Sequence, residues 1–202
     1  MKLLKLISLL FIATIGSLFV SCEETAEVDE YDNWQNRNAE FIDSIAEAAK
    51  VNSDGKWLKI LSYKLNPVDG NGESVEYGVE DYIYCHIEVE GTGTQCPLFT
   101  DSVSVNYRGR LMPTLVSPQG KVFDESYKGE LNAAINVPKQ FVVSGLVVGW
   151  STALMKMVEG DIWRVYIPSE LGYGSKEKSD IPAYSALVFD INLLDIISGV
   201  KE

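Results

Sequence analysis

The sequence predicts an α+β fold in which a twisted antiparallel sheet wraps around one short helix. Three observations carry this prediction. Segments in which apolar and polar residues alternate, rich in branched and aromatic side chains, recur along the chain and are typical of half-buried strands. A single stretch among them, Leu146 to Val158, has apolar residues at helical spacing. A composition of 46% hydrophobic and 10% aromatic residues indicates a chain that builds a core.

The first 21 residues are expected to be a targeting segment. Lys2 and Lys5 precede an apolar run over residues 6–20, which is short for a membrane span. The run leads to Cys22. This pattern resembles a bacterial lipoprotein signal, which implies that Cys22 becomes the lipidated first residue of the mature protein. The alternative is an ordinary secretory signal followed by an incidental cysteine.

The residues after Cys22 are strongly acidic and predict a solvated tether. A sharper interpretation is that acid next to a lipidated cysteine marks sorting to the outer membrane or cell surface. Over the whole chain 29 acidic residues oppose 17 basic ones, giving a formal net charge of −12. With no basic patch, this balance argues against nucleic acid as a partner.

Tyr31 to Val51 is predicted to form a helix that ends at the Asn52–Gly55 turn. Its apolar stripe recurs at spacings near 3.6 residues and consists of Trp34, Arg37, Phe41, Ile45 and Ala48 or Ala49. Nothing beside it in the sequence buries this stripe. It could pack on the main domain, pair with a second copy to form a homodimer, or remain a loose arm.

Two strands are predicted next, Trp57 to Leu65 and Asp81 to Glu90, with a turn over residues 66–72 between them. The second strand alternates and suits a sheet with one buried face. One side carries Tyr82, Tyr84, His86 and Glu88, and the other Ile83, Cys85, Ile87 and Val89. His86, on the polar side, is expected to be an exposed sheet residue rather than a ligand.

The remaining predicted strands are Ser102–Leu111, Phe141–Val143, Ile162–Ile167 and Leu187–Ile196. The helix between them is expected to turn Val147, Trp150, Leu154 and Met157 inward. The chain thus divides into a signal (1–21), an acidic tether with the N-terminal helix (22–55), an extension strand and loop (56–80) and a main domain (81–202).

Cys85 and Cys96 flank a short Gly-containing loop. An exported protein meets a disulfide-permissive compartment, so the two thiols could close this loop. The apolar side on which Cys85 lies suits an inert buried thiol equally well.

Residues 101–196 contain neither His nor Cys, so the usual nucleophile–base pair or soft-ligand metal site cannot be assembled there. An apolar pocket can. Five ordered segments are Val103-Ser-Val-Asn-Tyr107, Gly120-Lys-Val-Phe-Asp124, Gly145-Leu-Val-Val-Gly-Trp150, Leu171-Gly-Tyr-Gly174 and Ala186-Leu-Val-Phe-Asp190. Together they resemble the FKBP-type peptidyl-prolyl cis-trans isomerases. The resemblance runs from near Glu88 almost to the C-terminus, about half of the chain.

The resemblance implies a role for each matching residue. Trp150 would be the floor beneath a proline ring, with Tyr107, Phe123 and Phe189 as walls. The Val147 N–H and the Tyr173 hydroxyl would hold substrate carbonyls, and Asp124 would orient Tyr107 or the twisting amide. Leu146, Ile181 and the less securely aligned Phe141 would complete the substrate-binding set. Without the ordered set, Trp150 and Phe189 would be plain core residues.

The implied activity is peptidyl-prolyl cis-trans isomerisation of proline-containing polypeptides in the cell envelope, with neither metal nor cofactor required. The alternative is a non-catalytic chaperone or binding module of the same fold. Two segments depart from the family pattern. The link over residues 111–120 is longer than usual, and the loop over 174–180 is charged where the family often has apolar residues.

Overall fold

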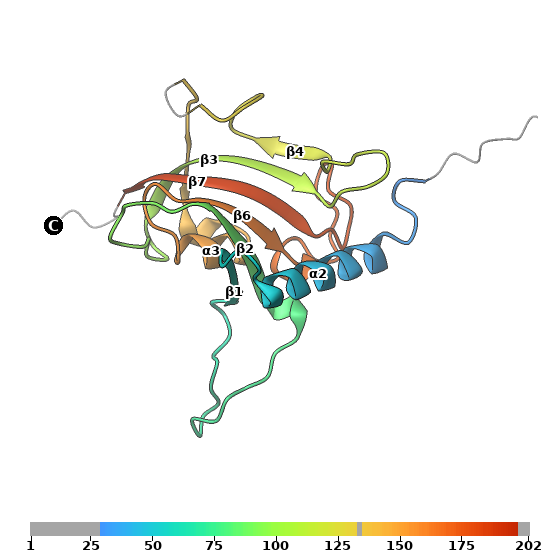
Figure 1. Ribbon diagram of the computed structural model, residues 1–202, viewed down its shortest axis with the longest axis horizontal. Coiled ribbons are helices and arrows are strands. Elements are labelled where there is room, and N and C mark those ends of the chain that lie inside the picture. Colours follow the sequence, from blue (N-terminus) through green and yellow to red (C-terminus); the bar gives the residue numbers. More distant parts are fainter. Residues whose placement is uncertain (1–28, 133–134, 198–202) are drawn as a thin grey trace, which may run out of the picture.

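The computed structural model describes residues 29–132 and 135–197, which form an antiparallel sheet with helices against it (Figure 1). The strands are β1 (Trp57–Leu61), β2 (Tyr82–Val89), β3 (Ser102–Leu111), β4 (Val122–Glu125), β5 (Lys139–Val142), β6 (Ile162–Ile167) and β7 (Leu187–Ile197). They lie in the order β1-β2-β6-β7-β3-β4, and β5 also pairs with β3. The α-helices are α2 (Trp34–Val51) and α3 (Val148–Leu154), and the 3₁₀ turns are η1 (Val79–Asp81), η2 (Val143–Gly145) and η3 (Ser169–Leu171). The predicted α+β arrangement is confirmed.

The pairing of β3 with β7 sets the centre of the sheet. Its register places Tyr107 opposite Ile191 and Gly109 opposite Phe189. Side chains of directly paired residues lie on the same face of a sheet, and residues two apart on one strand share that face. Tyr107 and Phe189, which come from distant parts of the chain, are therefore on the face that packs against α3.

Helix α3 is shorter than the sequence predicts. It was expected to extend from Leu146 to Val158 but spans seven residues, and turn hydrogen bonds to the Ala153 carbonyl close it. Trp150 and Leu154 are buried on the helix, and Met157 is buried just after it. Val147 is the N-cap residue and is only half-buried, because it faces a cavity rather than the core.

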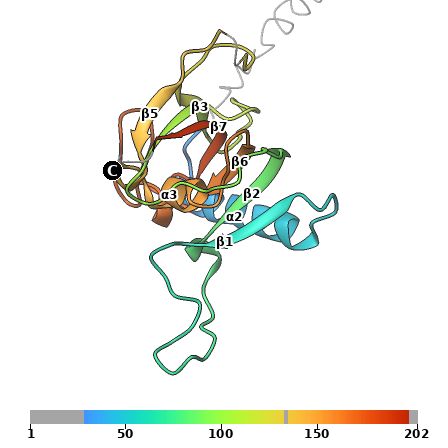
Figure 2. The same cartoon turned by 90° about the vertical axis from the view of Figure 1, so that its left-hand side faces the viewer.

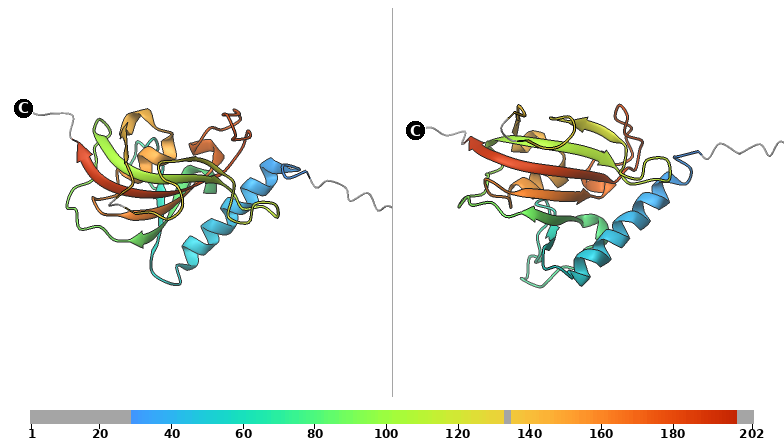
Figure 3. Two further views of the ribbon diagram at one scale, coloured as in Figure 1. Left: turned by 90° about the horizontal axis from the view of Figure 1, so that it is seen from above. Right: turned by 45° about the horizontal axis from the view of Figure 1, so that its top comes forward.

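Helix α2 packs on the main domain, the first of the three alternatives. It crosses the sheet on the face opposite α3, over β1, β2 and β6 (Figure 3). The buried stripe consists of Trp34, Asn38 and Ile42, whereas Arg37 and Phe41 are only half-buried. The buried face of the helix is therefore rotated relative to the predicted stripe, because its central residue is the polar Asn38. Pairing of two copies through this helix stays a prediction.

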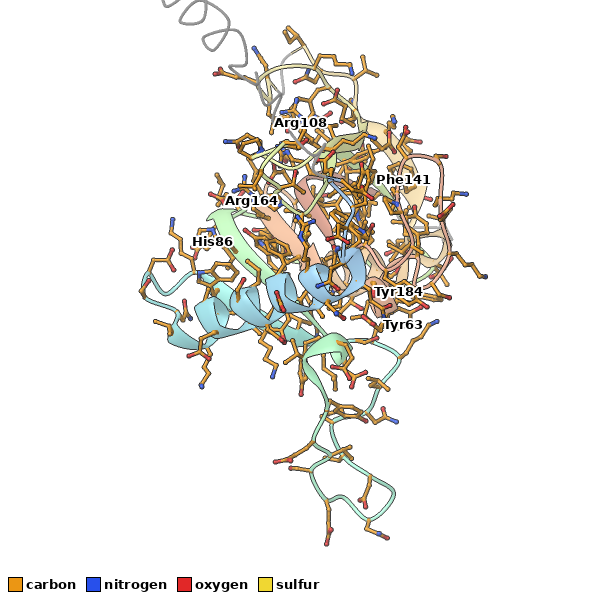
Figure 4. The ribbon with its side chains drawn as sticks, turned by 90° about the vertical axis from the view of Figure 1, so that its right-hand side faces the viewer. Tyr63, His86, Arg108, Phe141, Arg164 and Tyr184 are labelled. Carbon is orange, nitrogen blue, oxygen red and sulfur yellow. The ribbon has the colours of Figure 1, made fainter. Side chains whose placement is uncertain are left out.

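Strand β2 is buried on both faces, which corrects the expectation of one buried face. Tyr84 is fully buried beneath α2, and its hydroxyl donates to the Val79 carbonyl. Burial raises the pKa of Tyr84 to about 12. His86 is not a free surface residue, since its ring nitrogens lie 2.7 Å from Asp54 and 3.1 Å from Glu88. It lies near the C-terminal end of α2 (Figure 4).

The first strand ends at Leu61 rather than at Leu65. The chain turns there, because the Leu65 N–H donates to the Ser62 carbonyl. The segment from there to η1 leaves the sheet and projects away from the body of the molecule (Figure 2). Its tip is a turn in which the Asp69 carboxylate accepts hydrogen bonds from the backbone N–H groups of Asn71 and Glu73.

The two cysteines within the described residues are not bridged. Cys85 is buried and Cys96 is exposed, and burial raises the pKa of the Cys85 thiol. The inert buried thiol is thus the alternative that the structure supports for Cys85. Neither described α-helix is long and apolar enough to cross a membrane.

Gly149 allows α3 to approach β6. A Cβ atom at this position would lie 2.4 Å from Cγ2 of Ile167. Replacing a helical glycine by alanine ordinarily stabilises a helix by about 1 kcal/mol. We expect Gly149→Ala instead to destabilise the protein by about 1–3 kcal/mol in urea unfolding, because the added methyl overpacks the interface.

Gly145→Ala is the matched control, since a Cβ there meets no atom within 4 Å. This variant should leave the urea concentration at the unfolding midpoint nearly unchanged. The double variant with Ile167→Ala should lose less stability than the two single variants added together. Stabilisation by Gly149→Ala would contradict the packing described.

Candidate functional site

All ten side chains predicted from the sequence line one open cavity of about 470 Å³. It lies between the sheet and the first turn of α3, and its lining draws on β3, β4, β5, β7 and two loops. The residues that line it are Tyr107, Phe123, Asp124, Phe141, Gly145, Leu146, Val147, Trp150, Tyr173, Lys178, Ser179, Asp180, Ile181 and Phe189. The structure therefore brings the predicted set together around one cavity.

Trp150 is the centre of the cavity's aromatic lining. The edge-to-face contacts of its ring reach Phe189 at 5.2 Å, Tyr107 at 5.4 Å and Phe141 at 6.0 Å between ring centroids. Such contacts add to the free energy of burial and fix ring orientation. Phe141, whose match to the family pattern was the least secure, is half-buried on β5 and lines the cavity. Figure 4 shows it at the side of the sheet.

Phe123 and Phe189 form a second edge-to-face pair, with centroids 5.4 Å apart. Gly109 on β3 lies against both rings, and a Cβ atom there would come within 2.5 Å of Phe189 and 2.7 Å of Phe123. Gly109 thus lets the two walls meet over the strand. Gly109 was not predicted as a site residue, because a glycine within an alternating strand carries no signal of the rings that cover it.

The polar side of the cavity is a hydrogen-bonded group of three residues. The Tyr107 hydroxyl donates to Oδ2 of Asp124 at 2.6 Å, and Lys139 Nζ donates to the Tyr107 hydroxyl at 3.0 Å. Lys139 Nζ also lies 3.5 Å from Oδ1 of Asp124. Asp124 thus contacts Tyr107, which is one of the two partners expected for it. Lys139 was missed, and only its pairing register on β5, opposite Val105, places it here.

These contacts move the pKa values of Tyr107 and Lys139 away from neutrality. Burial raises the pKa of Tyr107, and its hydrogen bond to Asp124 raises it further. The hydrogen bond to Tyr107 raises the pKa of Lys139. Tyr107 therefore remains a neutral phenol and Lys139 a cation at neutral pH.

Two hydrogen-bond donors at the cavity are available to a ligand. Among the described residues no group bonds to the Tyr173 hydroxyl, and burial raises the pKa of Tyr173. Val147 is the N-cap of α3, where backbone N–H groups have no partner within the helix. The two donors face a cavity whose walls are mainly aromatic and aliphatic.

The charged loop over residues 174–180 forms part of the cavity rim. Lys178 and Ile181 exchange backbone hydrogen bonds of 2.9 Å each, which closes a tight turn around Ser179. The turn holds Ile181 nearly buried at the cavity edge, and Asp180 lies 3.9 Å from Lys121. The departure from the family pattern thus changes the rim and not the floor.

The arrangement can bind a compact apolar group and orient flanking carbonyls. Its ionisable lining residues are Asp124, which is ion-paired with Lys139 outside the lining, two tyrosines, and Lys178 and Asp180 on the rim. His86 lies outside it, on β2 beside Asp54. Within the described part of the chain no three His, Cys, Asp or Glu residues gather as metal ligands would.

The sequence profile of the family described as FKBP-type peptidyl-prolyl cis-trans isomerase matches residues 93–194. The peptidyl-prolyl cis-trans isomerase Mip of Coxiella burnetii is 37% identical over 103 residues, which is 50% of this chain and 40% of that protein. The FKBP-type 22 kDa peptidyl-prolyl cis-trans isomerase of Escherichia coli is 40% identical over 103 residues, 50% of this chain and 44% of that protein.

The crystal structure of FkpA from Escherichia coli superimposes with a TM-score of 0.56 at 26% identity, covering 84% of this chain and 63% of that one. The matched segment spans about half or less of the length of these curated relatives. It nevertheless contains every side chain that lines the cavity. The chain belongs to the FKBP-type peptidyl-prolyl cis-trans isomerase family.

Proposed function

We propose that this protein is a peptidyl-prolyl cis-trans isomerase that acts on X–Pro bonds of exported or envelope polypeptides. The observation that carries the proposal is the aromatic cavity, in which three rings meet Trp150 edge to face beside two donors available to a ligand. A proline ring fits such a floor, and the donors suit the carbonyls on either side of it.

The reaction needs no nucleophile or base. An X–Pro amide rotates slowly because resonance must be broken, with a barrier of roughly 18–20 kcal/mol. The planar amide is more polar than the twisted one and is better solvated by water. A cavity that is poor in water therefore favours the twist. A rate gain of about 10⁵ requires roughly 7 kcal/mol of differential stabilisation.

Each group of lining residues has a separate role in this stabilisation. Trp150 supports the proline ring, and Phe123 and Phe189 exclude water from it. The Val147 N–H and the Tyr173 hydroxyl hold the flanking carbonyls and keep them fixed while the amide turns. Leu146 and Ile181 contact the neighbouring residues of the substrate.

The polar group has a separate role in this proposal. The Tyr107 hydroxyl is held by Asp124 and Lys139, so its ring keeps one orientation beside Trp150. Asp124 also presents a fixed negative charge at the edge of the cavity, where it interacts with the developing dipole of the twisted amide.

We further propose that the protein is anchored in the cell envelope through a lipid on Cys22 and faces exported clients, with the outer membrane as its site. Residues 1–28 lie outside the described part of the chain, so the sequence pattern alone supports this proposal. The division into signal, tether with helix, extension and main domain belongs to the same proposal. The docking of α2 on the sheet makes the helix part of the main body.

Truncating one wall tests the catalytic role. Phe123→Ala removes a half-buried ring from the cavity, and losing about 2 kcal/mol of apolar contact should lower kcat/KM roughly thirtyfold. Tyr173→Phe removes one hydroxyl and should cost about 1 kcal/mol, or roughly fivefold. A protease-coupled assay on an X–Pro peptide measures both.

Thermal unfolding of each variant provides the control for stability. Tyr77→Phe is the matched hydroxyl control, because Tyr77 bonds to the Asn66 carbonyl on the projecting segment, far from the cavity. It should keep full activity. If the wild-type protein gave the rate of buffer alone while still binding the peptide, the non-catalytic binding module would replace the isomerase.

The pH profile provides a second test. The pKa values of Tyr107, Tyr173 and Lys139 are all raised, so each keeps its proton as the pH passes through neutrality. Amide rotation also transfers no proton. We therefore expect kcat/KM to stay nearly flat from about pH 6 to 8. A bell-shaped profile centred near neutrality, or a loss on chelation that a divalent ion restores, would contradict the mechanism.

Lipidation is tested with the Cys22→Ala variant in the bacterial host. Metabolic labelling with a clickable palmitate analogue should mark the wild-type protein and not the variant. The variant should leave the membrane fraction, since stable attachment depends on the acyl chains. Cys96→Ala is the matched control and should label like the wild type. Equal labelling of the Cys22 variant would contradict attachment at Cys22, and a wild-type protein without label would favour the ordinary secretory signal.

A further inference from the structure

The buried face of α2 has a polar side chain at its centre. Asn38 is 2% exposed, and both halves of its amide are hydrogen-bonded. Its Oδ1 accepts the backbone N–H of Ala186 at 2.8 Å, and its Nδ2 donates to the Trp34 carbonyl at 2.7 Å. A buried amide so satisfied joins the helix to a segment 148 residues away in a defined geometry.

Trp34 makes the second connection, one helical turn earlier. Its Nε1 donates to Oγ of Ser185 at 2.9 Å, and that hydroxyl donates in turn to the Pro182 carbonyl at 2.7 Å. The indole is 7% exposed and meets the ring of Tyr31 edge to face at 5.0 Å. Two side chains of α2, neither of which lines the cavity, thus form hydrogen bonds to residues 182–186.

Residues 182–186 connect two walls of the cavity. Ile181 precedes the segment and Phe189 follows it on β7, and both line the cavity. Within it Tyr184 has a φ of 60°, a left-handed conformation that is unfavourable for a residue with a bulky side chain. Figure 4 shows Tyr184 beside α2. Such a backbone conformation persists only where its surroundings fix it.

We propose that α2 is a positioning element of the cavity, in which Asn38 and Trp34 fix residues 182–186 and so hold Ile181 and Phe189 in their catalytic places. This inference rests on the proposed isomerase function. Neither residue lines the cavity, so both act through the segment that they hold. Without Asn38 the buried Ala186 N–H loses its acceptor, and the segment must shift to reach another.

The effect on turnover follows from geometry. Displacing a substrate-orienting group by about 1 Å can cost up to about a hundredfold in rate. We expect Asn38→Ala in the full chain to lower kcat/KM on an X–Pro peptide by about tenfold, at a temperature well below its unfolding midpoint. Asn38→Asp keeps an oxygen for the Ala186 N–H and should recover part of the activity.

Asn52→Gly is the matched control. Asn52 is the C-cap of the same helix, and both halves of its amide bond to the backbone of Trp57, at the other end of α2 from residues 182–186. Its φ of 44° is one that glycine adopts freely. This variant also removes two side-chain hydrogen bonds between α2 and the domain, but it should keep wild-type kcat/KM.

A methyl NMR spectrum separates positioning from a general loss of stability. The Ile181 δ1 methyl resonance, assigned with Ile181→Val, should shift in Asn38→Ala and remain unchanged in Asn52→Gly. If Asn38→Ala does not fold, Trp34→Phe decides, because a phenyl ring keeps part of the aromatic packing and has no N–H to donate to Ser185. Trp34→Phe should lower kcat/KM, and adding it to Ser185→Ala should lower it no further.

The outcomes distinguish the two proposals. A wild-type protein without isomerase activity would overturn the proposed function, and this inference with it. An active wild type, together with an Asn38→Ala variant of unchanged kcat/KM and unshifted Ile181, would overturn the positioning role alone. Equal losses of kcat/KM in Asn38→Ala and Asn52→Gly would overturn it as well.

Discussion

The edge-to-face packing of three rings around Trp150 is the interaction on which the site depends. Tyr107, Phe141 and Phe189 come from three different strands, so these contacts form only when β3, β5 and β7 have paired in register. A slip of one residue in any of these pairings would turn the ring to the other face of the sheet. The register of the sheet and the shape of the cavity are thus a single constraint.

Charge on the opposite face of the sheet reinforces this register. Asp190, directly after Phe189, accepts hydrogen bonds of 2.7 Å from Arg110 on β3 and from Arg164 on β6. Burial alone would raise the pKa of Asp190, but the two arginines lower it overall. Its contribution to stability is therefore present at neutral pH and is lost as the pH falls through the lowered folded-state pKa. One carboxylate links three strands while its neighbour forms a wall of the cavity.

The sequence was sufficient for residues whose identity carries the signal. Large aromatics at ordered motif positions, such as Phe123 and Trp150, were placed correctly in one cavity. Gly109 and Lys139 were missed because their importance arises from what lies across the strand, and a lysine on a short edge strand resembles any solvated charge. β4 was not predicted as a strand, since four residues offer too little alternation.

The error in the N-terminal helix has a similar cause. An asparagine such as Asn38 is expected to be exposed to solvent. Its burial depends on a hydrogen bond from a backbone N–H 148 residues later in the chain. No local pattern reveals such a partner. Tyr84 was likewise assigned to a polar face, although the helix that covers it was itself predicted.

That separation along the chain also governs the order of folding. Helix α2 is synthesised well before Ser185 and Ala186, so the helix can dock fully only after these two residues have been made. Closing a loop of this size carries a large entropy cost that local contacts do not offset in advance. Strand β7, which pairs with both β3 and β6, is also synthesised after Ser185 and Ala186. The docking of α2 and the completion of the sheet therefore both follow the synthesis of residues 185–197.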